Sequence, residues 1–84
     1  MCLAIPARVI ALEPGEMAVV GLEGVRKRVS VALLDQVTVG DYVLVHVGYA
    51  LHLLSEDEAE RTLALMAEAG ILDDELSEMT GGAP

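Results

Sequence analysis

One cysteine, Cys2, and two histidines, His46 and His52, are the side chains of this sequence whose types best suit metal or nucleophilic chemistry. A thiolate and an imidazole together suit a borderline or soft metal such as iron. One cysteine with one or two histidines still falls short of the four ligands that close a structural zinc site. Any metal bound by these groups would therefore be held openly and transiently, with further ligands supplied from outside the chain.

The position of Cys2 favours an exposed thiol. A lone cysteine in mid-chain is often a small buried hydrophobe, but chain ends usually lie at the surface. A second residue as small as cysteine permits removal of Met1, so we hypothesise that Cys2 becomes the N-terminus. A neighbouring ammonium group would favour the thiolate, which is the form that binds a metal or attacks an electrophile.

The residues around these groups allow both structural and functional interpretations. Pro6 biases Ile5 towards an extended shape, so it is either a strand-edge proline or part of a stiff arm that presents Cys2. Asp41 is typical of a turn. A cysteine and a histidine can form a nucleophilic pair, but the sequence offers no convincing third member and no oxyanion motif. We therefore expect no catalytic residue and no independent enzyme.

The first 54 residues have the pattern of short strands that would carry these side chains. Period-two alternation runs from Val25 to Leu33, with Val25, Val29, Val31 and Leu33 on one face. Tyr42–Leu54 is the strongest strand signal, with Val43, Val45, Val47 and Tyr49 on one side and Leu44, His46 and Gly48 on the other. The pattern predicts a first strand through Val9–Leu12, a second at Met17–Leu22, and turns at Pro14-Gly15, Gly24 and Val39–Asp41.

The period then changes to that of a helix. Ser55 and Glu58 form a predicted capping box, and Gly70 is a natural stop. The predicted apolar face of this helix is Ala59, Leu63, Met66 and Ala67. The chain is thus predicted to be mainly β: a single domain over 1–84, with a small OB-like β-barrel at 1–54, a helix at 55–69 and an acidic, mobile tail at 70–84 that has a loose turn around Leu72–Met79.

Charge and composition narrow the function classes. Residues 1–54 carry five acids and four bases, a net charge of −1, whereas residues 55–84 carry nine acids and one base, a net charge of −8. Nucleic-acid binding is disfavoured, because affinity for phosphates comes largely from Lys and Arg. No membrane span or secretory signal is apparent, so we expect a cytoplasmic protein, monomeric when free. With 54% hydrophobic residues in 84, some apolar surface should remain for a partner.

Two segments stand out together, Met1–Pro6 at the start and Gly40–Ala50 in the strong strand. With these motifs the chain resembles the HypC/HupF family of nickel–iron hydrogenase maturation chaperones over about residues 1–69. The opening motif is specific because it is fixed to the chain start. Tyr49 stands where many members have another aromatic side chain, and nothing is carried over to the tail after Gly70.

The resemblance implies an OB-type barrel with a C-terminal helix, and a carrier role. Family members bind the HypD scaffold while an iron carrying two cyanides and one carbon monoxide is built. They then bind the precursor of the hydrogenase large subunit and help pass the iron to it. By position, Cys2 would contact the iron or the partner, and His46 would act nearby as a ligand or as a donor to one. The implied partner-binding residues are Cys2, Leu3, Ile5, Pro6, Asp41, His46 and Gly48.

Two alternatives stay open. One is a small enzyme or redox protein that uses Cys2 and His46 without a partner. The other is an OB-type module that binds nucleic acid or a ligand, in which Cys2 has no role. Turnover by the isolated chain would favour the first, and tight, salt-dependent binding of oligonucleotides would favour the second.

Overall fold

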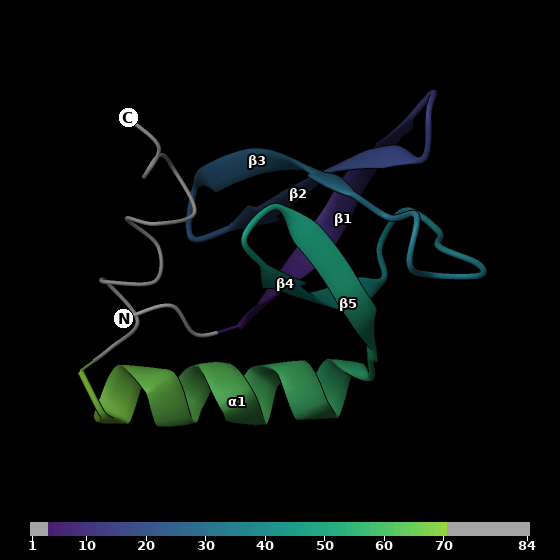
Figure 1. Cartoon of the computed structure of the whole chain (residues 1–84). Helices are drawn as coiled ribbons and strands as arrows, with labels where there is room; N and C mark the ends of the chain where they lie inside the picture. The colour runs from purple at the N-terminus through teal and green to yellow at the C-terminus, as the bar shows by residue number, and fades with distance from the viewer. Residues whose placement is uncertain (1–3, 71–84) are drawn as a thin grey trace.

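A computed structural model describes residues 4–70 of the chain, as five strands followed by one helix (Figure 1). Cys2, Leu3 and, apart from Gly70, the tail predicted at 70–84, with its turn around Leu72–Met79, lie outside the described residues. The elements are β1 (Ile5–Glu13), β2 (Met17–Leu22), β3 (Val25–Ser30), β4 (Tyr42–His46), β5 (Tyr49–Leu54) and α1 (Glu56–Glu68).

The strands close into a barrel in the order β1-β2-β3-β5-β4. The long strand β1 makes closure possible because it serves two neighbours: residues 5–8 pair with β4 and residues 8–13 pair with β2. All pairs are antiparallel except β3 with β5, which are parallel and meet at Ser30 and Tyr49. The predicted class is confirmed: the protein is mainly β, with a small five-stranded barrel of OB type and one C-terminal helix.

Small and β-branched side chains fill the barrel. The interior is narrow, and β-branched residues pack well on a pleated surface. Valines from four different strands, Val9, Val20, Val29 and Val43, are almost completely buried, and Ala7, Ala18 and Ala50 fill the gaps between them. A core made of such small side chains leaves many of the larger aliphatic residues of the chain at the surface.

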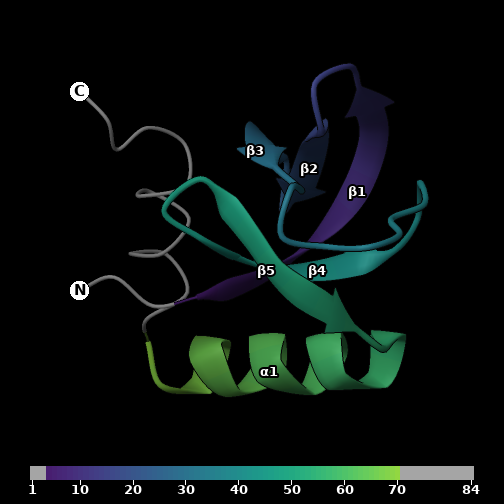
Figure 2. The same cartoon turned by 45° about the vertical axis from the view of Figure 1, so that its right-hand side comes forward.

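Helix α1 lies against one end of the barrel (Figure 1, Figure 2) and contacts β1, β4 and β5. The predicted capping box is confirmed: the Glu58 amide donates to Ser55 Oγ at 3.1 Å, and the Ser55 amide donates to Glu58 Oε1 at 3.2 Å. Ala59 and Met66 are buried, as predicted, but Ala67 is exposed. Ala67 is turned away because it lies about 100° around the helix from Met66.

The C-terminal end of α1 is also as predicted. Gly70 has a φ of 75°, and its amide donates to the Ala67 carbonyl at 3.2 Å. A glycine adopts this left-handed conformation without the steric cost that a Cβ would add, so it ends the helix. Within residues 4–70, no helix is long and apolar enough to cross a membrane.

Two of the predicted strands are wrong in extent. The strand predicted from Val25 to Leu33 ends at Ser30, because the chain turns there: the Ala32 amide donates to Ser30 Oγ, and the Leu34 amide donates to the Val31 carbonyl. Leu33 is consequently exposed rather than on an inward face.

The single strand predicted over Tyr42–Leu54 is a hairpin. Strands β4 and β5 are joined by the two residues Val47 and Gly48, whose φ angles are 50° and 85°. Positive φ at both central residues is the mark of a tight I′-type turn, whose twist matches that of the flanking strands. The predicted inward face therefore ends at Val45. Val47 and Tyr49, which were assigned to that face, are exposed.

Candidate functional site

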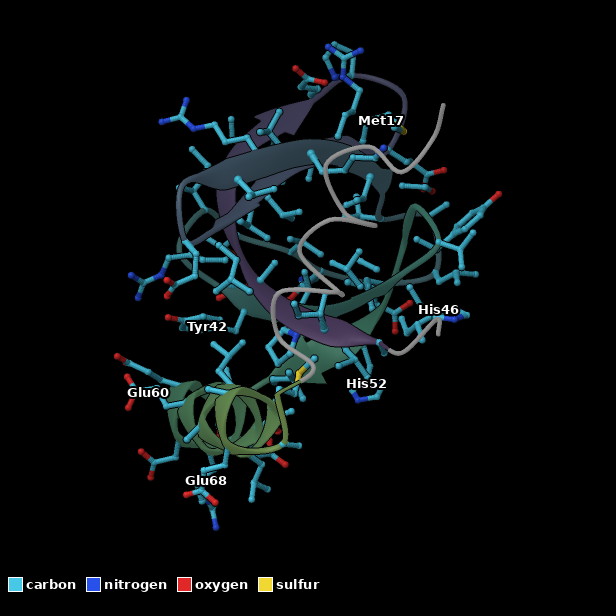
Figure 3. All side chains as sticks on the ribbon, turned by 90° about the vertical axis from the view of Figure 1, so that its left-hand side faces the viewer. Met17, Tyr42, His46, His52, Glu60 and Glu68 are labelled. Carbon is cyan, nitrogen blue, oxygen red and sulfur yellow. The ribbon has the colours of Figure 1, made fainter. Side chains whose placement is uncertain are left out.

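His46 is the last residue of β4, and its side chain is half-buried. The preceding residue, Val45, points into the barrel and is buried. Because side chains alternate along a strand, His46 belongs to the outer face. Figure 3 shows it projecting from the barrel on the same side of the view as His52, whereas Tyr42, at the other end of β4, lies on the opposite side.

Strand pairing brings the start of the chain to the His46 end of β4. Ile5 is the residue of β1 opposite Val45, the neighbour of His46. Cys2 lies outside the described residues, and two residues, Leu3 and Ala4, stand between it and Ile5 in the sequence. The register therefore places the first residue of β1 at the His46 end of β4.

The two residues that anchor this opening segment are buried. Ile5 and Pro6 both lie in the section of β1 that pairs with β4, where Pro6 is opposite Leu44. A proline fits a strand only where its missing N–H is not needed. Their packing fixes where the segment leaves the barrel. Any contact that Ile5 or Pro6 makes with a partner stays a prediction.

Asp41 occupies the other end of β4. Its Oδ2 accepts a hydrogen bond from the Thr38 amide at 2.9 Å, and its carbonyl accepts from the Val9 amide at 2.8 Å. These contacts make it a turn residue that ties the β3–β4 loop to β1. Five residues of strand place it about 16 Å from His46. The structure therefore does not bring Asp41 and His46 together, and a partner contact at Asp41 stays a prediction.

Gly48 lies next to His46 in sequence but in the hairpin turn. A glycine within a strand often marks a close approach of another backbone, yet a Cβ at Gly48 would meet no other heavy atom within 4 Å. The glycine is instead required by its φ of 85°. Its carbonyl accepts a hydrogen bond from the Ser30 amide at 2.9 Å, which fastens the turn to the end of β3.

The described residues contribute histidine side chains but no complete ligand set. His52 is exposed on β5, opposite Leu44, two positions along β4 from His46. Among residues 4–70, no group of three or more His, Cys, Asp or Glu side chains is placed to hold a metal ion. What this end of the barrel can offer is one imidazole at a half-buried position, which could complete a site whose other ligands come from elsewhere.

An exposed apolar strip next to His46 was missed by the sequence analysis. It consists of Val47 in the turn and Tyr49, Leu51 and Leu53 along β5, whose exposed fractions are 71%, 51%, 38% and 45%. Beyond Tyr49, a shallow groove separates β5 from the β3–β4 loop, and its loop side is lined by Leu33, Leu34, Asp35 and Gln36. The signal that could have revealed the turn was Gly48 between two apolar runs, because glycine is favoured at the second central residue of such a turn.

The hairpin that carries this strip has no charged side chain of its own, but Asp35 lines the loop side of the groove beside Leu51 and Leu53. No Asp, Glu, Lys or Arg occurs from Tyr42 to Leu54. Arg8 lies at the Asp41 end of β4, with its guanidinium 4.9 Å from the centre of the Tyr42 ring and its Nε donating to the Gly40 carbonyl at 3.3 Å. Arg28 pairs with Glu13 at 2.7 Å. The β4–β5 hairpin is therefore uncharged itself, with one acidic side chain, Asp35, across the groove.

The comparison with known proteins gives a consistent result. Residues 1–66 match the model of the HupF/HypC family. The chain is 59% identical over 73 residues to "Hydrogenase maturation factor HypC" of Rhizobium leguminosarum bv. viciae, covering 87% of this chain and 97% of that protein. It is 57% identical over 68 residues to the protein of the same name from Cupriavidus necator, covering 81% and 76%. It is also 36% identical over 69 residues to "Hydrogenase maturation factor HybG" of Escherichia coli, covering 75% and 84%.

Proposed function

Because this chain belongs to the HupF/HypC family, we propose that it is a hydrogenase maturation factor, a chaperone rather than an enzyme. The observation that carries the proposal is the family match over residues 1–66, which includes both the opening segment and the β4–β5 hairpin. The relatives are named for hydrogenase maturation, so the partners of this chain belong to that process.

The finer proposal is that the chain carries iron between two partners. One is a HypD-type scaffold protein, and the other is the precursor of the large subunit of a nickel–iron hydrogenase. The cargo is an iron with two cyanides and one carbon monoxide, bound transiently and shared with the partner. Cys2 contributes a thiolate to the iron or to the partner site. His46 acts beside it, either as a ligand of the iron or as a hydrogen-bond donor to another ligand of the iron.

The strand register supports this division of roles. Pairing of Ile5 with Val45 starts β1 at the His46 end of β4, and only two residues, Leu3 and Ala4, stand between Cys2 and Ile5. A chain of that length spans at most about 10 Å, which is short enough for the thiol to act beside the imidazole. A carrier must release its cargo, and one thiolate with one imidazole binds less tightly than a closed four-ligand cage. We also propose that the chain works in the cytoplasm, where thiols stay reduced, and that it is monomeric when free.

The test is co-purification of the full chain with the scaffold and, separately, with the large-subunit precursor. We expect Cys2→Ala to fold normally and to lose both stable complexes, while Glu23→Asn, at the exposed tip of the β2–β3 hairpin, retains them. Intact mass spectrometry of the wild-type chain reports whether Met1 is removed. Unchanged complexes and unchanged hydrogenase maturation with Cys2→Ala would contradict the proposal.

The role of His46 has its own readout. Cyanide and carbon monoxide bound to iron absorb in the infrared at frequencies that depend on the other ligands. In the loaded complex with the scaffold, we expect His46→Ala to shift these bands and His52→Ala to leave them in place. Identical bands in the wild type and in His46→Ala would remove His46 from the iron environment.

A further inference from the structure

The barrel has two hairpins with the same tight turn but with opposite chemistry at the tip. Strands β2 and β3 are joined by Glu23 and Gly24, with φ angles of 53° and 81°, and strands β4 and β5 are joined by Val47 and Gly48, with φ angles of 50° and 85°. Such turns favour Asn-Gly or Asp-Gly, because both central residues need positive φ. A valine in this position is unusual, since β-branched residues are strongly disfavoured there.

Packing in the core does not offset the strain at Val47, because its side chain is 71% exposed. The turn itself is fastened by backbone groups, through the hydrogen bond from the Ser30 amide to the Gly48 carbonyl. An asparagine at position 47 would keep that bond and fit the turn better. The described fold therefore does not explain why an apolar, β-branched side chain is held at this tip.

Exposed apolar side chains follow the valine along β5, at Tyr49, Leu51 and Leu53. The strand is irregular at Leu51, because Val45 lies opposite Ala50 and Leu44 lies opposite His52, so the three do not lie on one regular strand face, and Tyr49 is the one beside His46. Since Tyr49 pairs with His46 across the hairpin, the strip begins beside the histidine of the proposed transfer site. We propose that the strip of Val47, Tyr49, Leu51 and Leu53 is the surface on which an uncharged, apolar segment of the scaffold protein docks, with Val47 as its leading contact. This inference rests on the proposed function and adds the surface that holds the partner.

The charges of the strip and its surroundings indicate which kind of segment can bind there. Tyr42–Leu54 contains no Asp, Glu, Lys or Arg, and the one charged side chain that lines the groove beside Leu51 and Leu53 is the acidic Asp35, which disfavours an acidic occupant. The C-terminal segment of the chain itself, residues 71–84, carries Asp73, Asp74, Glu75 and Glu78, and burying such groups without partners is costly. An uncharged apolar segment of a partner therefore suits the strip better than the acidic segment of this chain.

The experiment compares two asparagine substitutions in the full chain. Val47→Asn and Glu23→Asn each give an Asn-Gly turn, one at either tip. We expect Val47→Asn to raise Tm by about 2–8 °C and to weaken binding of the purified HypD-type scaffold by at least about tenfold. Glu23→Asn should leave binding unchanged. Tyr49→Ser, in the same strip, should also weaken binding by at least about tenfold, as measured by calorimetric titration.

The outcomes separate this inference from the proposed function. Scaffold binding that is lost with Cys2→Ala but unchanged with Val47→Asn and Tyr49→Ser would overturn the docking strip and leave the proposed function standing. A wild-type chain that does not bind the scaffold would overturn both. Self-association of the chain that Val47→Asn abolishes would assign the strip to a second copy, and NMR contacts between Tyr49 and residues 71–84 in the free chain would assign it to the C-terminal segment. Either result would overturn the inference.

Discussion

The two tight hairpins of the barrel differ in what their tips serve. Both have positive φ at the two central residues, and non-glycine residues in that region cost on the order of 1–3 kcal/mol each. At the β2–β3 tip the residue is Glu23, which is charged and solvated. At the β4–β5 tip it is Val47, which is apolar and also exposed. The first tip is explained by contact with water. The second is explained by contact with another protein.

The same contrast extends to the strands behind each tip. Behind the β2–β3 tip lies the basic run Arg26-Lys27-Arg28, and Arg28 pairs with Glu13. Behind the β4–β5 tip lie His46 and the apolar strip, in a segment without charged residues. One side of the barrel is therefore an ordinary charged protein surface, and the other carries an uncharged hairpin, with Asp35 across its groove, next to the predicted iron-contacting residues.

The largest expected effect comes from copying one tip onto the other. Val47→Glu reproduces the Glu-Gly sequence of the β2–β3 turn without changing its geometry. We expect the chain to fold with similar stability and to bind the scaffold at least about a hundredfold more weakly, because a charge would be buried in an apolar interface. Titration calorimetry measures this. The reverse change, Glu23→Val, should leave scaffold binding unaltered, and weaker binding there would erase the contrast between the tips.

The next effect concerns the geometry that the two tips share. Gly48 and Gly24 both have positive φ and free space where a Cβ would lie. We expect Gly48→Ala and Gly24→Ala each to lower the free energy of unfolding by about 1–2 kcal/mol, through backbone strain alone. Urea denaturation measures both. A loss at one position and none at the other would show that the two turns are not equivalent.

A smaller effect separates stability from binding. Ser55→Ala removes the capping bond to the Glu58 amide at the start of α1, at the opposite end of β5 from the Val47 tip. We expect a loss of about 1 kcal/mol in unfolding free energy and no change in the dissociation constant of the scaffold complex. Weakened binding with Ser55→Ala would mean that global stability, rather than the Val47 tip, controls the complex.

The smallest effect is expected on the charged side. Arg28→Ala breaks the ion pair with Glu13, whose arginine is about two-thirds exposed. Exposed pairs of this kind contribute about 0–1 kcal/mol. We expect the stability to change within that range, to a lesser degree at high salt, and the scaffold complex to be unaffected. Scaffold binding that depends strongly on Arg28 would contradict the account, because it would place the partner on the charged side of the barrel instead of the Val47 side.

Local signals in the sequence were sufficient for much of the fold. The capping box at Ser55 and Glu58, the stop at Gly70 and the turn at Pro14-Gly15 each depend on neighbouring residues only, and each is present. The β4–β5 turn was missed because Val47 is not a turn residue, so the apolar alternation continues through it. The site follows the same division. Its residue types could be read from the sequence, but the pairing of Ile5 with Val45, which brings β1 to the His46 end of β4, is a long-range contact.

The most direct test of the account is amide hydrogen–deuterium exchange of the full chain, alone and bound to the scaffold. Exchange reports which backbone amides a partner covers or stabilises. The account predicts slower exchange on binding at His46–Leu54 and unchanged exchange at the Leu22–Val25 turn. Protection of the Glu23 tip instead, or no protection at either tip, would contradict it.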